Sequence, residues 1–315
     1  MQNPPVALDT RPAVAVESVT HRYGDRRALD RVSFEVGARE IFGLLGPNGG
    51  GKTTLFKIAS TLLGPSEGRV RVFGDDVVGH AAAVRERMGV VFQRPALDAR
   101  LTVLENLRHQ GHLYGLHGAD LRQRAAAVLA GVGLGARAGD LVGVLSGGLQ
   151  RRAEVAKALL HQPALLLLDE PSTGLDPSAR RDIWQDLCRR RDEHGTTVVL
   201  TTHLMDEAAA CDRVAILDEG SLVALGTPAG LVATIGGDVL TVTAHDAPGL
   251  APRVAAHFGV DVEVVDGRIR IERDQGHRFI AALVEAFPGE IDAVALGKPT
   301  LEDVFVHYTG RRWES

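Results

Sequence analysis

Residues 43 to 54 have the sequence GLLGPNGGGKTT, and this segment decides the fold expected for the chain. It matches the pattern G-x-x-x-x-G-K-[ST] through Gly46, Gly51, Lys52 and Thr53. Successive backbone N–H groups of such a turn form a concave anion site, and the helix that follows directs its positive end there. The segment therefore predicts a loop that binds the phosphates of a nucleoside triphosphate. The residues expected to bind are Gly46, Pro47, Asn48, Gly49, Gly50, Gly51, Lys52, Thr53 and Thr54.

Charged and hydroxyl side chains predict the chemistry at this loop. Lys52 adds a point charge toward the β and γ phosphates, and Thr53 can be a ligand for Mg²⁺. In the segment LLLLDEPSTGLDP, residues 165 to 177, four leucines place Asp169 and Glu170 at the end of a central strand. Asp169 would hold the Mg²⁺ hydration shell. Glu170 would accept a proton from the attacking water or orient that water.

A histidine and a second glycine turn add to the candidate site. His203 ends the apolar strand pattern VVLTTH and predicts a contact to the γ-phosphate. Far from the phosphate loop, residues 145 to 150 have the sequence LSGGLQ, in which Ser146 precedes Gly147 and Gly148. A helical pattern follows directly, so the serine hydroxyl, the glycine N–H groups and the helix N-terminus can together contact an anion.

Strand and helix patterns alternate along the chain in the order typical of a parallel α/β sheet with an antiparallel β edge. Helical patterns dominate from about residue 95 to 160, which predicts an inserted helical subdomain. Residues 237–315 have the order β-α-β-β-α-β, which is typical of a small ferredoxin-like α+β domain. We therefore expect a disordered tail at 1–12, an ATPase domain at 13–236 and an accessory domain at 237–315.

The composition is that of a globular protein without an overall excess of positive charge. The chain has 315 residues, of which 45% are hydrophobic and 24% charged, and its net charge is −5. We therefore expect no nucleic-acid partner. The longest aliphatic runs are far shorter than the roughly 20 residues that span a bilayer. Any membrane role must therefore come through a partner protein.

Taken in order, these segments resemble the ATP-binding subunit of ABC transporters, over roughly residues 14 to 230. That family also uses an aromatic that stacks on adenine, a Q-loop glutamine that reaches the metal and water, and a D-loop. The matching residues are Tyr23 in HRYGDRRAL, Gly46 to Thr54 (Walker A), Gln93 in VVFQ (Q-loop), Leu145 to Gly148 (signature), Asp169 and Glu170 (Walker B and catalytic base), Ser172 to Asp176 (D-loop) and His203 (switch histidine). The resemblance places Asp176 and Gln93 among the ATP contacts, with Gln93 also near Mg²⁺.

The resemblance implies a division of labour between two chains. Two ATPase subunits, identical or closely homologous, pair head to tail with ATP between them. The signature of one subunit then faces the phosphate loop of the other, so ATP joins the subunits and hydrolysis releases them. This cycle would power export through a separate membrane permease. The chain would then lie on the cytoplasmic face of the cell membrane, bound through that permease, with ATP and Mg²⁺ as cofactors.

Two residues depart from the common family pattern. Leu149 stands where the signature usually has glutamine, and an apolar residue there followed by RR resembles the branch of daunorubicin-resistance and sodium-export ATPases. The segment TLEDVFVHYTG, residues 300–310, resembles the terminal segment of drug and ABC-2-type exporter ATPases and so indicates the same branch. Gly50 stands where alanine or serine is usual, and we expect a slightly looser loop that keeps its function.

Two other functions use part of the same pattern. A soluble mechanical ATPase that acts on DNA or ribosomes also has a signature, but such proteins have long heptad arms or two cassettes, which this sequence lacks. A small-molecule kinase with a P-loop would give LSGG and STGLD no role. The sequence leaves the cargo and the permease open. It also leaves open whether residues 237–315 have a structural role, which would be to stabilise a dimer or cover a sheet edge, or a regulatory role.

Overall fold

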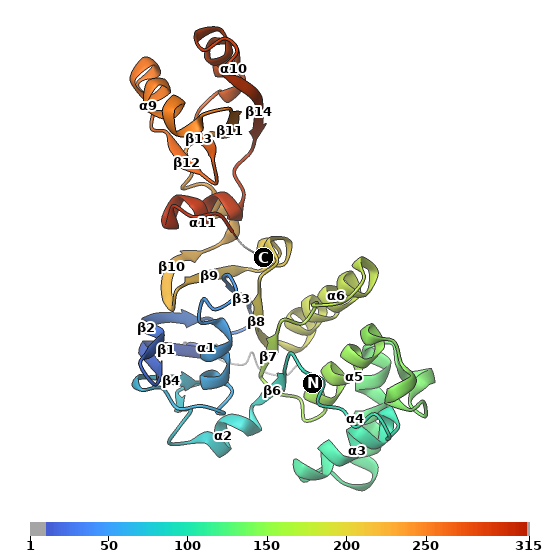
Figure 1. Ribbon diagram of the computed structural model, residues 1–315. Coiled ribbons are helices and arrows are strands. Elements are labelled where there is room, and N and C mark those ends of the chain that lie inside the picture. The colour runs from blue at the N-terminus through green and yellow to red at the C-terminus, as the bar shows by residue number, and fades with distance from the viewer. Residues whose placement is uncertain (1–10, 314–315) are drawn as a thin grey trace, which may run out of the picture.

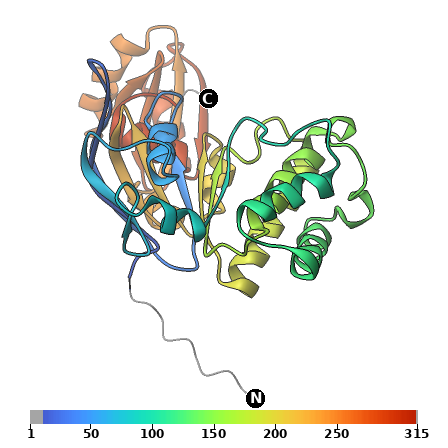
Figure 2. The same ribbon diagram turned by 90° about the horizontal axis from the view of Figure 1, so that it is seen from below.

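The computed structural model describes residues 11–313. The tail predicted at residues 1–12 lies outside the described residues, except for its last two positions. Three β-sheets follow one another through the molecule, and the C-terminal one stands at the far end from helices α3 to α5 (Figure 1). Figure 2 shows those helices as a separate lobe beside the sheets.

A six-stranded sheet forms the centre of the molecule. In spatial order its strands are β10 (Ser221–Gly226), β9 (Arg213–Asp218), β3 (Ile41–Leu45), β8 (Thr197–Thr202), β7 (Leu165–Asp169) and β6 (Met88–Val91). All neighbours pair in parallel except β10, which is antiparallel to β9. Every residue of β3, β7 and β8 is buried, as expected for parallel strands that are covered on both faces.

Alternate residues of these strands face two different cores. On one face, Leu166 and Leu168 pack with helices α3 to α8 and α11. On the other, Leu165 and Leu167 pack with α1 (Lys52–Ala59) and the N-terminal sheet. Because α1 is held between two sheets, its first turn and the loop before it are fixed on both sides.

The N-terminal sheet is antiparallel and has the order β2-β1-β4-β5. Its strands are β1 (Val14–Tyr23), β2 (Arg26–Val36), β4 (Glu67–Val72) and β5 (Asp75–Asp76). The predicted pairing of the first two strands as an antiparallel edge is confirmed. A short helix, α2 (Ala81–Glu86), leads from this sheet to β6.

Between residues 95 and 160 the structure contains helices and one isolated β-bridge, Thr102–Leu141. The helices are α3 (Val103–Leu113), α4 (Gly118–Gly131), the short 3-10 helices η1 (Gly135–Arg137) and η2 (Val142–Val144), and α5 (Gly147–Leu159). Helix α3 begins at a capping box, in which Thr102 accepts from the N–H of Glu105 and the Glu105 carboxylate accepts from the N–H of Thr102.

Helix α6 (Pro177–His194) connects β7 to β8, and α7 (Met205–Ala209) and α8 (Pro228–Val232) follow β8 and β10. Among the described residues, no helix combines the length and the apolar character that a membrane span requires.

The C-terminal sheet has the order β12-β13-β11-β14, and all its pairs are antiparallel. The elements are β11 (Asp238–Ala244), α9 (Ala247–Phe258), β12 (Glu263–Val265), β13 (Arg268–Arg273), α10 (Gly276–Ala286) and β14 (Ile291–Gly297). The β-α-β-β-α-β order is the one that the sequence predicts. Asp266 and Gly267 form the turn between β12 and β13 with φ of 50° and 70°, because a two-residue turn of the type favoured by Asp-Gly needs positive φ at both positions.

The last helix, α11 (Leu301–Thr309), lies between this small sheet and the central part of the molecule (Figure 1). It contacts α7, α8 and β10, and Leu301, Val304 and Phe305 belong to the same core as the central sheet. The end of the chain is therefore anchored on the phosphate-loop domain, although sequence grouped it with the accessory domain.

Candidate functional site

The phosphate loop lies between β3 and α1, and its glycines are required by close backbone contacts. Gly49 and Gly51 have φ of 82° and 103°, a region that favours glycine. A Cβ on Gly46 would lie 2.3 Å from the Leu217 carbonyl oxygen, and one on Gly50 would lie 3.0 Å from it. The loop backbone therefore lies close against the end of β9, and the looser loop expected from Gly50 stays a prediction.

A cavity of about 180 Å³ opens over this loop. Residues distant in sequence meet there, because strand ends from two sheets converge on it. Its lining consists of Tyr23, Arg26, Ala28, Pro47, Asn48, Gly49, Gly51, Lys52, Thr53, Thr54 and Glu170. Tyr23 is 48% exposed, so its ring is available to a planar ligand. Arg26 and Ala28 were missed by the sequence analysis, although Arg26 follows Tyr23 by three residues in a segment already singled out.

Lys52 is buried beneath the loop, with 4% of its surface exposed. Its ammonium group donates to the carbonyl oxygens of Gly46 at 2.5 Å and Pro47 at 3.0 Å. Burial lowers the pKa of Lys52, and the carboxylates of Glu170 and Asp169 oppose that shift. The site thus holds a desolvated cation next to two acidic groups.

Asp169 ends β7 and accepts a hydrogen bond from the hydroxyl of Thr201 at 2.5 Å. Burial raises the pKa of this carboxyl group, and the Thr201 hydrogen bond acts in the opposite direction. Thr53 has an exposed side chain at the start of α1. Among residues 11–313, no three His, Cys, Asp or Glu side chains form a metal cluster. Thr53 and Asp169 supply oxygen donors that fit Mg²⁺ only together with phosphate oxygens and water.

Glu170 is the most constrained carboxylate of the site. Its φ is 47°, a left-handed conformation that is costly for a residue with a side chain, and its backbone N–H donates to the Thr201 hydroxyl at 3.0 Å. Its carboxylate accepts two hydrogen bonds, one from the Gln93 amide at 3.0 Å and one from the Thr173 hydroxyl at 3.2 Å. His203 Nδ1 lies 3.3 Å from the other carboxylate oxygen, without the alignment of a hydrogen bond. Strand β8, which ends before His203, pairs directly with β7, so both side chains reach the same edge.

Four predicted contacts of the signature and the D-loop lie apart from this cavity within one chain. Ser146 caps α5 by accepting from the N–H of Leu149 at 3.4 Å, and it is exposed with Gly147. None of Ser146, Gly147 and Gly148 lines the cavity over the phosphate loop. Asp176 is also outside it. Its carboxylate caps α6 through the N–H groups of residues 178 and 179, and those hydrogen bonds lower its pKa.

Arg151 connects the signature helix to the catalytic strand and was missed by the sequence analysis. It is 8% exposed and makes a salt bridge of 3.0 Å with Glu154. Its guanidinium also donates to four backbone carbonyl oxygens, those of Phe92, Asp169, Glu170 and Pro171. It therefore holds the residues next to Gln93 and Glu170.

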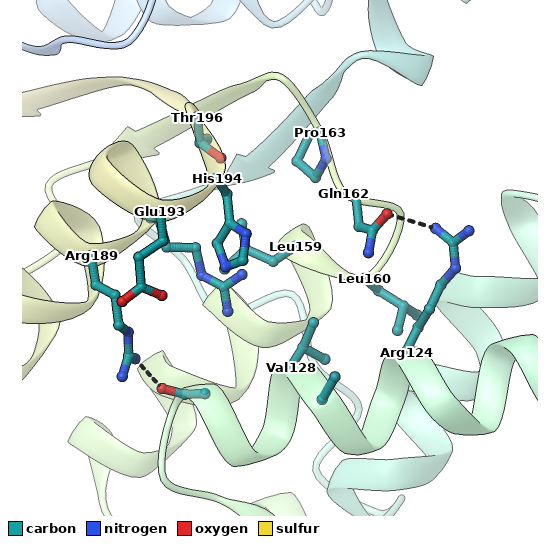
Figure 3. Close-up of a pocket in the computed structure, with 13 residues that line it drawn as sticks. Arg124, Val128, Leu159, Leu160, Gln162, Pro163, Arg189, Glu193, His194 and Thr196 are labelled. Carbon is teal, nitrogen blue, oxygen red and sulfur yellow. Dashed lines mark hydrogen bonds between the residues drawn. The ribbon is translucent and has the colours of Figure 1, made fainter. Parts of the chain in front are cut away.

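A separate cavity of about 460 Å³ lies between α4, the end of α5 and α6 (Figure 3). Arg124, Arg189, Glu193 and His194 line it with apolar residues such as Val128 and Leu159. None of the predicted site residues contributes to it, so this cavity is distinct from the phosphate site.

A phosphate loop between a parallel strand and a helix, with acidic residues at the end of a strand two places away, defines a P-loop nucleoside triphosphatase. Residues 29–173 match the family model described as ABC transporter. The chain belongs to the family of ABC transporter ATP-binding proteins, and it is an ATPase subunit of that class.

Curated relatives match almost the whole chain. The daunorubicin/doxorubicin resistance ATP-binding protein of Streptomyces peucetius is 39% identical, covering 96% of this chain and 94% of the relative. The Nod factor export ATP-binding protein I of Ralstonia nicotianae is 38% identical, covering 98% of both chains. The match includes the accessory domain, since it extends far beyond residue 236.

Solved structures agree with the fold. A subunit from Clostridium perfringens, titled as part of the ABC transporter complex cbiONQ, has a TM-score of 0.65 and 27% identity, covering 79% of this chain and 96% of its own. A dimeric ATP-binding cassette in a post-hydrolysis state with ADP and Pi has a TM-score of 0.63 and 30% identity, covering 68% of this chain and 98% of its own. Both confirm the predicted class of ATPase fold.

Proposed function

We propose that the chain powers export of a substrate through a separate permease, from the cytoplasmic face of the membrane. The ATPase class supports the energy source, and the named roles of the relatives in resistance and export support the direction. The observation that carries the proposal is the Glu170 carboxylate at the edge of the phosphate cavity, which accepts hydrogen bonds from Gln93 and Thr173 and belongs to a residue with a left-handed backbone conformation.

The predicted residues in and around the cavity have proposed tasks. Lys52 exchanges its backbone carbonyl partners for β and γ phosphate oxygens. Glu170 accepts a proton from the attacking water, while His203 contacts the γ-phosphate from the neighbouring strand. Mg²⁺, held by Thr53 and through water by Asp169 and Gln93, would neutralise phosphate charge. Tyr23 stacks on the adenine ring.

The signature is proposed to act on ATP bound by a second subunit. Ser146 and Gly147 are exposed at the N-terminus of α5 and lie outside the cavity of their own chain. A helix N-terminus with a serine cap and free glycine N–H groups is suited to a γ-phosphate presented from outside. Two subunits placed head to tail would complete two such sites. Asp176, exposed at the start of α6, would lie near the same interface.

A groove next to Gln93 is the proposed contact for the permease. It has a volume of about 280 Å³ and lies between β6, the end of α1 and the helices α3 and α5. Leu62 and Tyr114 line it, and Leu113, beside Tyr114, is 82% exposed. Phe92, which also lines the groove, directly precedes Gln93. A permease segment seated there would therefore shift the glutamine that contacts Glu170.

Glu170→Gln tests the proposed catalytic role. The amide keeps the size of the side chain and cannot accept the proton, so ATP binding should persist while turnover is lost. With ATP and Mg²⁺, sedimentation should then show a stable dimer. Hydrolysis at the wild-type rate, or a variant that stays monomeric with ATP where the wild type dimerises, would refute the role.

A further inference from the structure

The end of the accessory segment contacts the back of the phosphate loop. The turn formed by residues 217–220, named here the backing turn, closes the β9–β10 hairpin behind the loop. The N–H of Gly220 donates to the carbonyl oxygen of Gly50 at 3.1 Å. The carbonyl oxygen of Leu217 occupies the space that a Cβ on Gly46 or Gly50 would need. The position of the backing turn therefore fixes the position of the loop backbone.

The backing turn itself is held by a charge from the far end of the chain. Arg311 makes ion pairs with two successive acidic residues, with Asp218 through Nη2 and with Glu219 through Nη1 at 2.8 Å. Asp218 is 8% exposed, and Arg311 is the cation that pairs with it among the described residues. Glu219 has a φ of 46°, so the turn has a strained conformation that an external contact helps to maintain.

Helix α11 determines where Arg311 lies. The helix ends at Gly310, whose φ of 66° turns the chain, and the Thr309 hydroxyl accepts from the N–H of Arg311 at 3.3 Å. At its other end, α11 is joined to the small sheet. Arg270 on β13 donates to the carbonyl oxygen of Asp303 at 3.3 Å. A shift of β13 would therefore be passed through α11 to Arg311.

A cavity shows that the two parts face each other without being fully packed. It has a volume of about 520 Å³ and lies between the phosphate loop and the β12–β13 hairpin. Asn48 and Gly49 line it from the loop, and Val264 and Asp266 from the hairpin. Arg311 also lies in this lining, and its two ion pairs with Asp218 and Glu219 join the segment after α11 to the phosphate-loop side of the cavity.

We propose that Arg311 is a positioning residue that sets the ATP affinity of the phosphate loop through the backing turn. The accessory domain thereby regulates nucleotide binding and does more than cover the sheet edge. The inference rests on the proposed use of the loop for ATP. Loss of Arg311 leaves Asp218 buried without its cation and frees the turn, so the loop loses part of its preorganisation for the phosphates.

Three variants of the full-length chain test this by calorimetric titration with ATP and by ATPase kinetics. Arg311→Ala should weaken ATP affinity by about threefold to tenfold, and should raise KM more than it lowers kcat. Arg311→Lys should recover the affinity only in part, because an ammonium group cannot contact both carboxylates as a fork. Arg312→Ala is the matched control, since Arg312 is 54% exposed and its two carboxylate contacts, Glu302 at 3.7 Å and Asp266 at 4.0 Å, both lie outside the backing turn, and it should leave affinity unchanged.

A fourth variant keeps the test decisive if Arg311→Ala folds poorly. In Arg311→Met with Asp218→Asn, no charge is left buried alone, yet the link to the turn is still lost, so the weaker affinity should persist. Wild-type affinity in this double variant or in Arg311→Ala would overturn the inference. Wild-type protein that binds no ATP would instead overturn the proposed function, and the inference with it.

Discussion

Replacing Arg151 by alanine removes the side chain that joins the signature helix to the catalytic strand. The guanidinium is 8% exposed and is shared between the Glu154 carboxylate and four backbone carbonyl oxygens. Alanine leaves Glu154, which is 6% exposed, with the N–H of Ala96 at 2.6 Å as its remaining hydrogen bond. The variant therefore buries a carboxylate that has lost its cation.

The expected loss of stability follows from that burial. Removing one partner of a buried ion pair costs about 3–5 kcal/mol. Each kcal/mol lowers the unfolding midpoint by about 2–4 °C in a domain of 150–250 residues, so a fall of about 6 °C or more is expected. Since Arg151 also holds the backbone next to Gln93 and Glu170, kcat should fall by about tenfold to a hundredfold below the new midpoint.

Thermal unfolding and steady-state ATPase assays measure both effects. Arg152→Ala is the matched control, because Arg152 is 20% exposed and pairs with Asp182, which is 45% exposed. Because this pair is only partly buried, its contribution should be about 1 kcal/mol or less. Combining Arg151→Met with Glu154→Gln should recover part of the stability, since no buried charge remains unpaired, but little of the activity. If Arg151→Ala unfolds at the same temperature as Arg152→Ala and keeps the wild-type kcat, Arg151 does not hold the catalytic strand as assigned.

Two further predictions concern the ligand side of the cavity. Tyr23→Ala should weaken ATP binding by about tenfold or less, because stacking contributes only about 1 kcal/mol. Tyr23→Phe keeps the ring and should bind ATP normally. If titration gives wild type, Tyr23→Ala and Tyr23→Phe the same affinity, Tyr23 does not contact the nucleotide. Thr53→Val keeps the side-chain shape and removes the hydroxyl, so the Mg²⁺ concentration for half-maximal ATPase activity should rise by about tenfold or more. ATP binding in EDTA should not change, and an unaltered Mg²⁺ requirement would exclude Thr53 as a ligand.

The central fold and the residues near the cavity could be predicted from short sequence patterns. The phosphate loop, Asp169, Glu170 and His203 each follow an apolar strand, and the ends of parallel strands meet at one edge, so their convergence could be inferred. The turn at Asp266 was predictable for another local reason, because the Asp-Gly sequence of its two residues favours the backbone conformation of a tight hairpin turn.

Contacts made over long distances in sequence could not be inferred in this way. The salt bridges of Arg311 depend on α11 packing against the central sheet, and nothing near residue 311 reveals the acidic turn at Asp218. Arg151 left a usable signal, because it lies on the face of α5 that also carries Val155 and Ala158, where a charge needs a partner. For Asp176 the motif predicted an ATP contact, which stays a prediction, and it did not reveal that the carboxylate caps α6.

The central claim is that the signature of one subunit completes the phosphate site of another. In a mixed dimer, one subunit carries Lys52→Ala and its partner carries Gly147→Asp, with Glu170→Gln in both to prevent turnover. A Cβ at Gly147 meets nothing within 4 Å among the described residues, so the aspartate disturbs the γ-phosphate contact and not the fold. Both lesions then share one composite site, and the other composite site is intact.

The amount of ATP trapped per mixed dimer shows whether the signature acts on its own subunit or on the partner. Each variant homodimer is measured as a control. The homodimers should trap almost none, because each damages both of its composite sites. The mixed dimer should trap one ATP in its intact site. If the signature acted on its own chain's phosphate loop, each subunit of the mixed dimer would be damaged, so a mixed dimer that traps no ATP while the Glu170→Gln parent does would contradict the account.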